Sequence, residues 1–170
     1  MITQKMEKAL NGQINKEFYS AYLYLAMSAY CNKLGMPGAE HWFRMQYDEE
    51  VIHMTKMFDY VMQHGGSAHL LQINEPPREF GTILEVFEES LRHEQFVTKS
   101  INALLDVAVE EKDHASQVFL QWYITEQVEE ESNVGDIVDR IKLAGDNGGA
   151  LMIIDDKLAQ RMPPSPITAP

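Results

Sequence analysis

Turn signals are rare in this 170-residue chain, and their scarcity constrains the fold more than any other feature. They occur at 33–38, 64–81, 110–116 and 144–149, which leaves four segments of roughly 27 to 31 residues and a short one at about 149–161. Few β-branched runs and no period-2 alternation occur, so strands are not expected. The sequence predicts an all-α protein with four long helices and a short fifth C-terminal helix.

Capping residues mark where several of these helices should begin. Pro37 suits a first helical turn, Asp113 fits an N-cap, and Thr82 with Glu85 fits a capping box that opens the third long helix. The first and second helices, and the third and fourth, are joined by short turns, so each pair should form an antiparallel hairpin.

The connector at 66–80 distinguishes between bundle topologies. Its fifteen residues, if extended, reach about 50 Å, whereas a 28-residue helix is about 42 Å long. The connector is therefore long enough to run the whole length of the bundle. The expected architecture is a four-helix bundle with one long crossover connection.

Charge and composition limit the classes of partner. The formal net charge of −12 argues against a nucleic-acid partner and suits cations. Cys31 is the only cysteine, which excludes an intrachain disulfide and fits a reducing cytosol. The N-terminus lacks the apolar region of a signal peptide, and no apolar run approaches the roughly 18 residues of a membrane span. We expect a cytoplasmic protein.

Carboxylates interrupt the expected core. A bundle core is filled by positions spaced alternately four and three residues apart. The four ladders at this spacing are Leu10, Ile14, Glu17, Ala21, Tyr24, Ser28; Ala39, Phe43, Gln46, Glu50, His53, Met57, Tyr60; Leu84, Phe87, Leu91, Glu94, Thr98, Ile101, Leu105; and Leu120, Tyr123, Gln127, Glu130, Val134, Ile137, Ile141. Each ladder is mostly apolar and contains a glutamate near its middle.

These polar residues should lie at one height in the bundle. Glu17 precedes the turn near 36 by 19 residues, and Glu50 and His53 follow it by 14 and 17; Glu94 and Glu130 are both 18 residues from the turn near 112. Burying one such charge without a partner costs several kcal/mol or shifts its pKa until it is neutral, and no lysine or arginine occupies these ladder positions.

Two divalent cations would neutralise four carboxylates, and oxygen ligands with imidazole suit iron or manganese, with zinc also able to bind. The i,i+3 spacing of Glu50 and His53 places both on one helix face. A single Glu-x-x-His is usually a surface pair, and a purely structural bundle whose core charges are satisfied by water or by each other is the alternative. The matching heights favour a metal centre.

Four sequence blocks resemble bacterial non-haem ferritin: "NKEFYSAYLYL" from residue 15, "DEEVIHM" from residue 48, "HE" at 93–94 and "TEQVEEES" from residue 125. The likeness covers essentially the whole chain up to its proline tail. It implies a ferritin-like diiron domain at 1–162, followed by a flexible proline-rich tail at 163–170. It also implies a ferroxidase that oxidises Fe(II) with O₂ or H₂O₂ and stores ferric mineral in a homo-oligomeric shell of 24 subunits.

The resemblance also implies ligands. One iron site would use Glu17, Glu50 and His53, and the second would use Glu94 and Glu130, with Glu50 bridging the two ions. Gln127 would line the site by hydrogen bonding. The ligands of a third iron site would be Glu49, Glu126, Glu129 and Glu130.

Several of these residues have simpler interpretations. A solvated acidic face is the alternative for Glu49, Glu126 and Glu129. The resemblance implies that Tyr24 acts near the diiron centre as an electron donor, and an ordinary core tyrosine is its alternative. Trp122 is interpreted as a packing residue.

The sequence differs from two related families, the bacterioferritins and the rubrerythrins, at positions that bear on metal and haem binding. Bacterioferritins and rubrerythrins carry a second Glu-x-x-His on the fourth helix, where this chain has the sequence QVEE at 127–130. Haem-binding bacterioferritin has a methionine directly after its bridging glutamate, which this chain lacks, so no haem is expected. The nearby methionines are interpreted as packing residues; these are Met45, Met54 and Met57.

The remaining histidines are expected at the surface or at helix caps; these are His41, His64, His69, His93 and His114. The short fifth helix would lie near a fourfold axis of the shell, or would fold back on its own bundle. A stand-alone diiron oxidase or peroxidase of small oligomeric state is the alternative to a storage protein.

Overall fold

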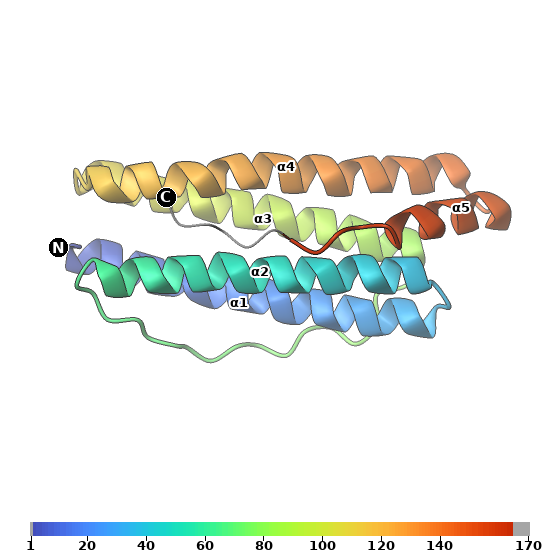
Figure 1. Cartoon of the computed structure of the whole chain (residues 1–170), viewed down its shortest axis with the longest axis horizontal. Helices are drawn as coiled ribbons and strands as arrows, with labels where there is room; N and C mark the ends of the chain where they lie inside the picture. Colours follow the sequence, from blue (N-terminus) through green and yellow to red (C-terminus); the bar gives the residue numbers. More distant parts are fainter. Residues whose placement is uncertain (1, 165–170) are drawn as a thin grey trace.

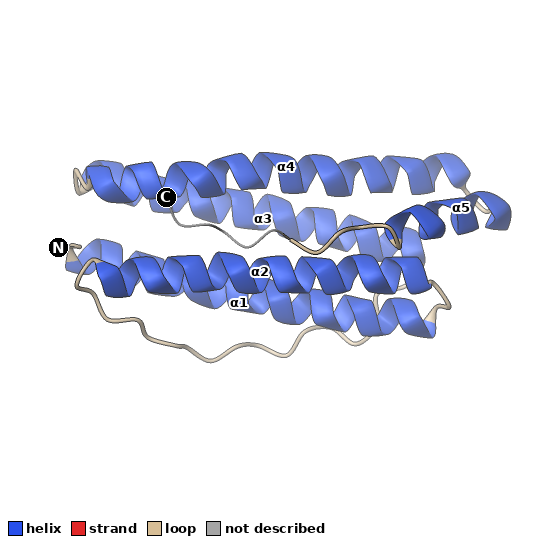
Figure 2. Cartoon of the chain, viewed as in Figure 1, coloured by secondary structure: helices blue, strands red, loops and turns tan. Residues whose placement is uncertain are grey.

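The computed structural model describes residues 2–164 and contains five helices (Figure 1). They are α1 Gln4–Lys33, α2 Pro37–Gln63, α3 Ile83–Glu110, α4 His114–Ala144 and α5 Gly148–Leu158. No strand occurs within the described residues, as Figure 2 shows. The predicted all-α class is confirmed. Of the predicted tail at 163–170, residues 165–170 lie outside the described part of the chain, and the domain boundary stays a prediction.

The connector between α2 and α3 runs the length of the bundle beside α1, so the predicted long crossover is confirmed (Figure 1). Hydrogen bonds to α1 hold it in place. The Asn11 amide donates to the carbonyl of Ser67 at 2.9 Å and accepts from the backbone N–H of His69 at 2.7 Å. The Tyr30 hydroxyl donates to the carbonyl of Gly81 at 2.9 Å. These bonds satisfy backbone groups that an extended segment cannot satisfy by itself.

The helix starts follow the predicted caps. Thr82 and Glu85 form the capping box of α3, and the Asp113 carboxylate accepts from the backbone N–H of Ser116 at 3.1 Å at the start of α4. α2 begins at Pro37 but has no side-chain cap of its own. Its free N–H groups are satisfied from α5 instead, as described next.

Asp155 of α5 caps α2. Its carboxylate accepts from the backbone N–H groups of Gly38 at 2.9 Å and Ala39 at 2.8 Å. A Cβ on Gly38 would lie 1.8 Å from the Asp155 carbonyl oxygen, so glycine is required for this close approach. The fifth helix therefore folds back on its own bundle and is held at the α2 N-terminus.

The core consists of two apolar clusters with a polar layer between them. One cluster surrounds Tyr24, Phe43 and Phe87, and the other surrounds Leu10 and Leu120. All the ladder residues predicted on α1 and α2 are buried. On α4 the predicted ladder residues are buried except Ile137, which is half-buried, and its neighbour Val138 is buried instead.

The predicted ladder of α3 was partly wrong. Four of its seven members are only half-buried. Most of the additional buried residues directly precede a ladder residue, on the side of the helix that faces α1. The half-buried ladder residues are Leu84, Leu91, Thr98 and Leu105, and the buried ones that the ladder missed are Val86, Ser90, His93, Val97, Ser100, Leu104 and Ala108. α3 packs against α1 as well as α4, which extends its buried stripe toward α1.

No helix within residues 2–164 has both the length and the apolar character that a membrane crossing requires.

Candidate metal centre

Five ionisable side chains from all four long helices meet in the polar layer. None of them has more than 3% of its surface exposed; they are Glu17, Glu50, His53, Glu94 and Glu130. Apolar residues of the two clusters precede and follow each of them along its helix. Charged groups are almost never buried so completely without a counter-charge, so the carboxylates of this layer are suited to bind cations.

Glu17, Glu50 and His53 offer ligand atoms that all lie within 4.8 Å of one another. The His53 Nδ1 atom lies 3.5 Å from Glu50 Oε2. The Oε2 atoms of Glu17 and Glu50 are buried and have no hydrogen-bond partner. Buried polar atoms are usually satisfied, so these two oxygens fit the ligand positions of a metal ion. Two carboxylates and an imidazole are a donor set that suits iron or manganese.

Glu94 and Glu130 form the other half of the centre, and amides hold both of them. The Gln127 amide donates to Glu94 Oε2 at 3.1 Å, and the Tyr24 hydroxyl also donates to the Glu94 carboxylate. The Gln46 amide donates to Glu130 Oε2 at 3.0 Å. The structure thus places Gln127 and Tyr24 against the predicted ligands.

Two glutamines that sequence reasoning did not assign to the site also hold ligands. Gln46 lay on the predicted ladder of α2, where a polar residue was the only signal of its role. Gln13 is buried off the ladder of α1 and donates to Glu17 Oε1 at 2.8 Å. Its position one turn before Glu17 was the available signal. Each of the two amides fixes one carboxylate oxygen and leaves the other free.

Burial changes the acidity of the centre. Desolvation, reinforced by the neighbouring carboxylates, raises the pKa of Glu50 well above its ordinary value. Burial also raises the pKa of Glu94 to about 7, against the hydrogen bonds from Tyr24 and Gln127, and that of Glu130 to about 8. The metal-free centre therefore holds protons near neutral pH, and a metal ion that binds there displaces them.

A second group of acidic residues lies beside the centre, between α2 and α4. We call it the outer acidic pocket: a cavity of about 370 Å³ whose lining includes Glu49, Glu126, Glu129 and Glu130. Ligand atoms of Glu49, His53 and Glu126 lie within 4.8 Å of one another. Glu49 and Glu126 are half-buried and Glu129 is exposed. The residues of the predicted third site are thus gathered around one cavity.

Arg161 also lines the outer acidic pocket, and sequence reasoning missed it. Its Nη2 atom lies 2.5 Å from Glu49 Oε2. The fifth helix was expected to continue to about 161 but ends at Leu158. The segment after α5 is therefore free to turn into the pocket, and no sequence signal indicated that turn.

The structure contradicts the prediction that His93 is a surface or cap residue. Its side chain is buried, and its Nε2 atom lies 2.8 Å from the Ser20 hydroxyl of α1. Burial lowers the pKa of His93 to about 4, so the imidazole is neutral at physiological pH. The physical reason is the stripe of α3 that faces α1, which includes the position 100° from Glu94.

The other histidines agree with the prediction. His69 and His114 are exposed, His64 is half-buried at the C-cap of α2, and His41 is half-buried. Trp122 is partly buried, with its ring edge-on to His53 at a centroid distance of 5.3 Å, so it packs directly on the centre.

Comparisons with known proteins agree with this geometry. Residues 7–144 match the family described as "Ferritin: Ferritin-like domain". The chain is 45% identical to a bacterial non-heme ferritin of Bacteroides fragilis, over 95% of this chain and 100% of that protein. It is 41% identical to a bacterial non-heme ferritin of Campylobacter jejuni, over 91% and 93% of the two chains.

Among solved structures, an open-pore ferritin of the archaeon Archaeoglobus fulgidus superimposes with a TM-score of 0.94. It shares 46% identity and covers 95% of this chain and 100% of its own. The shared fold, the buried layer of carboxylates and histidine, and these likenesses define a ferritin-like four-helix protein. The chain belongs to the ferritin family.

Proposed function

We propose that this protein is an iron-storage ferritin that oxidises Fe(II) to Fe(III) at the buried centre and stores ferric mineral within a homo-oligomer. The observation that carries the proposal is the layer of four buried carboxylates and one histidine, two of whose oxygens have no partner. The named non-heme ferritins among its relatives support the same function. The oxidant in this proposal is O₂ or H₂O₂, and the protein acts in the cytoplasm.

The proposed ligand roles are those that the family resemblance implies, and the close grouping of Glu17, Glu50 and His53 supports them. Glu17, Glu50 and His53 hold one Fe(II), and Glu94 and Glu130 hold the second, with Glu50 shared between them. Each Fe(II) gives one electron to the oxidant. Carboxylates favour the higher charge of Fe(III), so the ligand set lowers the free energy of the oxidised pair relative to the reduced pair.

Hydrogen bonds from the surrounding residues orient these ligands. Gln13 fixes one oxygen of Glu17 and leaves the other for a substrate ion. Gln127 and Tyr24, by contrast, each hold one oxygen of Glu94. Tyr24 donates to Glu94, which places its phenol beside the second iron position, where it can act as an electron donor. Burial raises the pKa of Tyr24 well above its ordinary value, so its hydroxyl proton stays in place.

A third iron position is proposed in the outer acidic pocket, at Glu49, Glu126, Glu129 and Glu130. Two features support it: the pocket adjoins the buried centre through Glu130, and His53 faces both groups of ligands. Iron at this position would lie on the solvent side of the oxidation centre.

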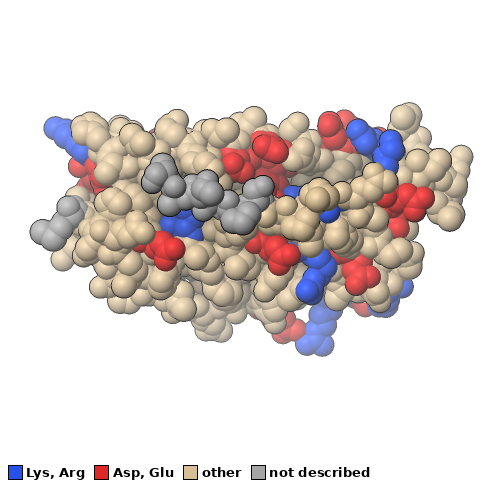
Figure 3. Space-filling model, viewed as in Figure 1, with Lys and Arg blue, Asp and Glu red and all other residues tan. Residues whose placement is uncertain are grey.

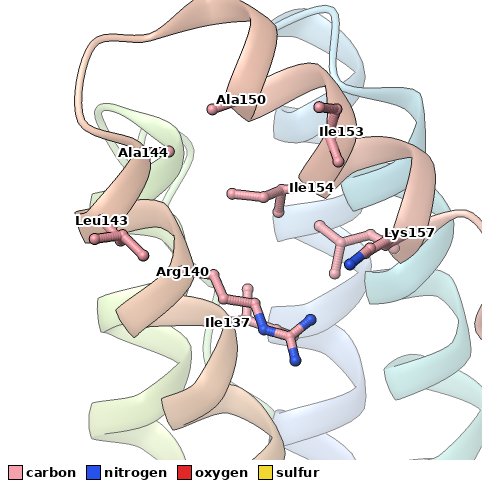
Figure 4. Close-up of a pocket in the computed structure, with 9 residues that line it drawn as sticks. Ile137, Arg140, Leu143, Ala144, Ala150, Ile153, Ile154 and Lys157 are labelled. Carbon is pink, nitrogen blue, oxygen red and sulfur yellow. The ribbon is translucent and has the colours of Figure 1, made fainter.

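Assembly into a shell of 24 subunits is also proposed. The support is the apolar corner formed by the end of α4 and by α5. There Leu143 is 90% exposed, Met152 69% and Ile153 61%. A cavity of about 390 Å³ separates the two helices, and its lining is mostly apolar (Figure 4). Large exposed apolar residues grouped in this way are typical of subunit contacts. The fifth helix would then lie near a fourfold axis.

Anaerobic titration with Fe(II), followed by admission of air, tests the oxidation centre. We expect saturable binding of at least two Fe(II) per chain and rapid oxidation on exposure to air. The absence of both would refute the metal centre and leave a structural bundle. Light scattering of the iron-loaded protein tests storage: a dimer that retains only two or three irons per chain would instead identify a stand-alone diiron oxidase.

A further inference from the structure

The segment that follows α5 carries a cation into the outer acidic pocket. After Leu158 the chain runs back between α2 and α4 (Figure 1). Acidic side chains lie on both sides of this segment on the face that Figure 3 shows. The turn places Arg161 in the lining of the pocket, together with Glu49, Glu126 and Glu130.

Three contacts hold Arg161 in this position. Its Nη2 atom lies 2.5 Å from Glu49 Oε2, and its guanidinium carbon lies 4.5 Å from the centre of the Trp42 ring. The His41 ring donates through Nε2 to the backbone carbonyl of Arg161 at 2.9 Å. Only 19% of the Arg161 side chain and 21% of the Glu49 side chain is exposed. The guanidinium is therefore ordered and partly desolvated, unlike that of an ordinary surface arginine.

The Glu49 carboxylate also belongs to a group of possible metal ligands. Glu49 offers an oxygen to the group that it forms with His53 and Glu126, where the three ligand atoms lie within 4.8 Å of one another. A divalent cation bound at this position and the guanidinium of Arg161 would both contact the Glu49 carboxylate. Two positive groups that contact one carboxylate repel each other.

We infer that Arg161 is the affinity-determining residue of the outer acidic pocket. Its guanidinium is a tethered counter-ion of Glu49, and a divalent cation must displace it or share Glu49 with it in order to bind. The inference rests on the proposed function only in taking the pocket to be a cation site. It assigns to this chain a residue that weakens the outer position more than the buried centre.

The buried centre offers the contrast that makes this assignment specific. Within residues 2–164, no lysine or arginine forms an ion pair with Glu17, Glu50, Glu94 or Glu130, whereas Glu49 is paired with Arg161. Divalent cations should therefore fill the buried positions first and the outer position last. Arg161 sets the separation between the two affinities.

Calorimetric titration of the full-length, metal-free protein with Zn²⁺ tests the inference, because Zn²⁺ binds the same ligands without redox chemistry. We expect Arg161→Gln to raise the affinity of the weaker class of sites by roughly two- to fivefold, which corresponds to the free energy of a partly exposed ion pair. The affinity of the tighter class should change by much less than that of the weaker class. Arg140→Gln is the matched control: Arg140 lines the same pocket, but its side chain is exposed and it is not the partner of Glu49.

Equal affinities of the weaker class in Arg161→Gln and Arg140→Gln would overturn the inference, because bulk charge alone would then explain the change. A weaker class that is absent from every variant would overturn it as well. The tight class is tested separately with Glu50→Ala: if this variant keeps the tight class, the proposed function fails, whereas the comparison of the two arginine variants still stands.

Tryptophan fluorescence supplies a second readout. The chain has two tryptophans, so Trp122→Phe leaves Trp42 as the only reporter. Because Arg161 stacks on Trp42, we expect Zn²⁺ binding to the weaker class to change the Trp42 emission. Adding Arg161→Gln should abolish that change. An identical Zn²⁺-dependent change with and without Arg161 would show that the guanidinium is not displaced.

Discussion

Two groups of glutamates lie side by side in this protein, and their negative charge is neutralised in different ways. In the buried centre, Glu17 and Glu50 are each 1% exposed and each has an oxygen without a partner. In the outer acidic pocket, Glu49 is partly exposed and pairs with Arg161. The first group requires a cation from outside, whereas the protein supplies a cation to the second. Adjacent residues of one helix thus acquire different chemistry from burial and from one tethered arginine.

The largest expected effect comes from removing the shared ligand. Glu50→Ala should slow the fast phase of Fe(II) oxidation by about 100-fold or more, because it removes a ligand from both iron positions. Stopped-flow absorbance after mixing with Fe(II) in air measures this rate. Glu49→Ala is the matched control, with an expected effect below about fivefold. Equal losses in the two variants would erase the distinction between the centre and the pocket.

The buried centre should also make the metal-free protein sensitive to pH. The raised pKa values, about 7 for Glu94 and about 8 for Glu130, mean that the folded state binds more protons than the unfolded chain above pH 4.5. The free energy of unfolding should therefore fall as pH rises from about 5 to 8, by an order of a few kcal/mol, and then level off.

Urea denaturation across this pH range measures the effect. Glu130→Gln should flatten the pH dependence and stabilise the metal-free protein at pH 8, because it removes a charge that the fold disfavours. An outer-pocket variant, Glu129→Gln, should leave the curve unchanged, since Glu129 is exposed. A stability that rises between pH 5 and 8 in metal-free protein would contradict the account of the centre.

Smaller effects are expected from the amides that orient the ligands. Gln46→Leu removes the hydrogen bond to Glu130 while nearly keeping the side-chain volume. It should weaken Zn²⁺ binding to the tight class, and slow Fe(II) oxidation, by roughly tenfold. If the tight class kept its full affinity in this variant, Glu130 would not need Gln46 for its orientation.

The smallest expected effect concerns the anchor of the C-terminal segment. Asp155→Ala leaves the N–H groups of Gly38 and Ala39 without their acceptor, which should cost about 1–2 kcal/mol of stability, as for the loss of an N-cap. Asp156→Ala is the control, because its side chain is exposed. If α5 positions Arg161, Asp155→Ala should also raise the affinity of the weaker Zn²⁺ class. Unchanged affinity would show that the contacts of Arg161 alone hold it in the pocket.

Sequence patterns could predict the bundle because its helices are long and the turns between them are few. Every residue that the four-three spacing placed in the core on α1 and α2 is buried. The same spacing failed on α3 because a helix packed against two neighbours has a stripe wider than one ladder. Glu94 lies on the predicted ladder, so its position was found, whereas the burial of Ser90 and His93, each one position before a ladder residue, was not.

The candidate ligands lie where spacing and family resemblance predicted, in one layer of the core. The supporting residues were less predictable. Gln13 acts through a contact with Glu17 that only side-chain packing specifies, and Arg161 reaches Glu49 across 112 residues of sequence. Such contacts depend on how a segment turns after its helix ends. Local propensity does not determine that turn.

Anomalous X-ray scattering from crystals soaked anaerobically in Fe(II) would locate each ion without assuming any ligand. We predict two strong peaks in the polar layer: one among Glu17, Glu50 and His53, and one among Glu50, Glu94 and Glu130. A weaker third peak should lie at Glu49 and Glu126, with Arg161 moved away from it. Strong peaks confined to the outer acidic pocket, with none in the buried layer, would contradict the account.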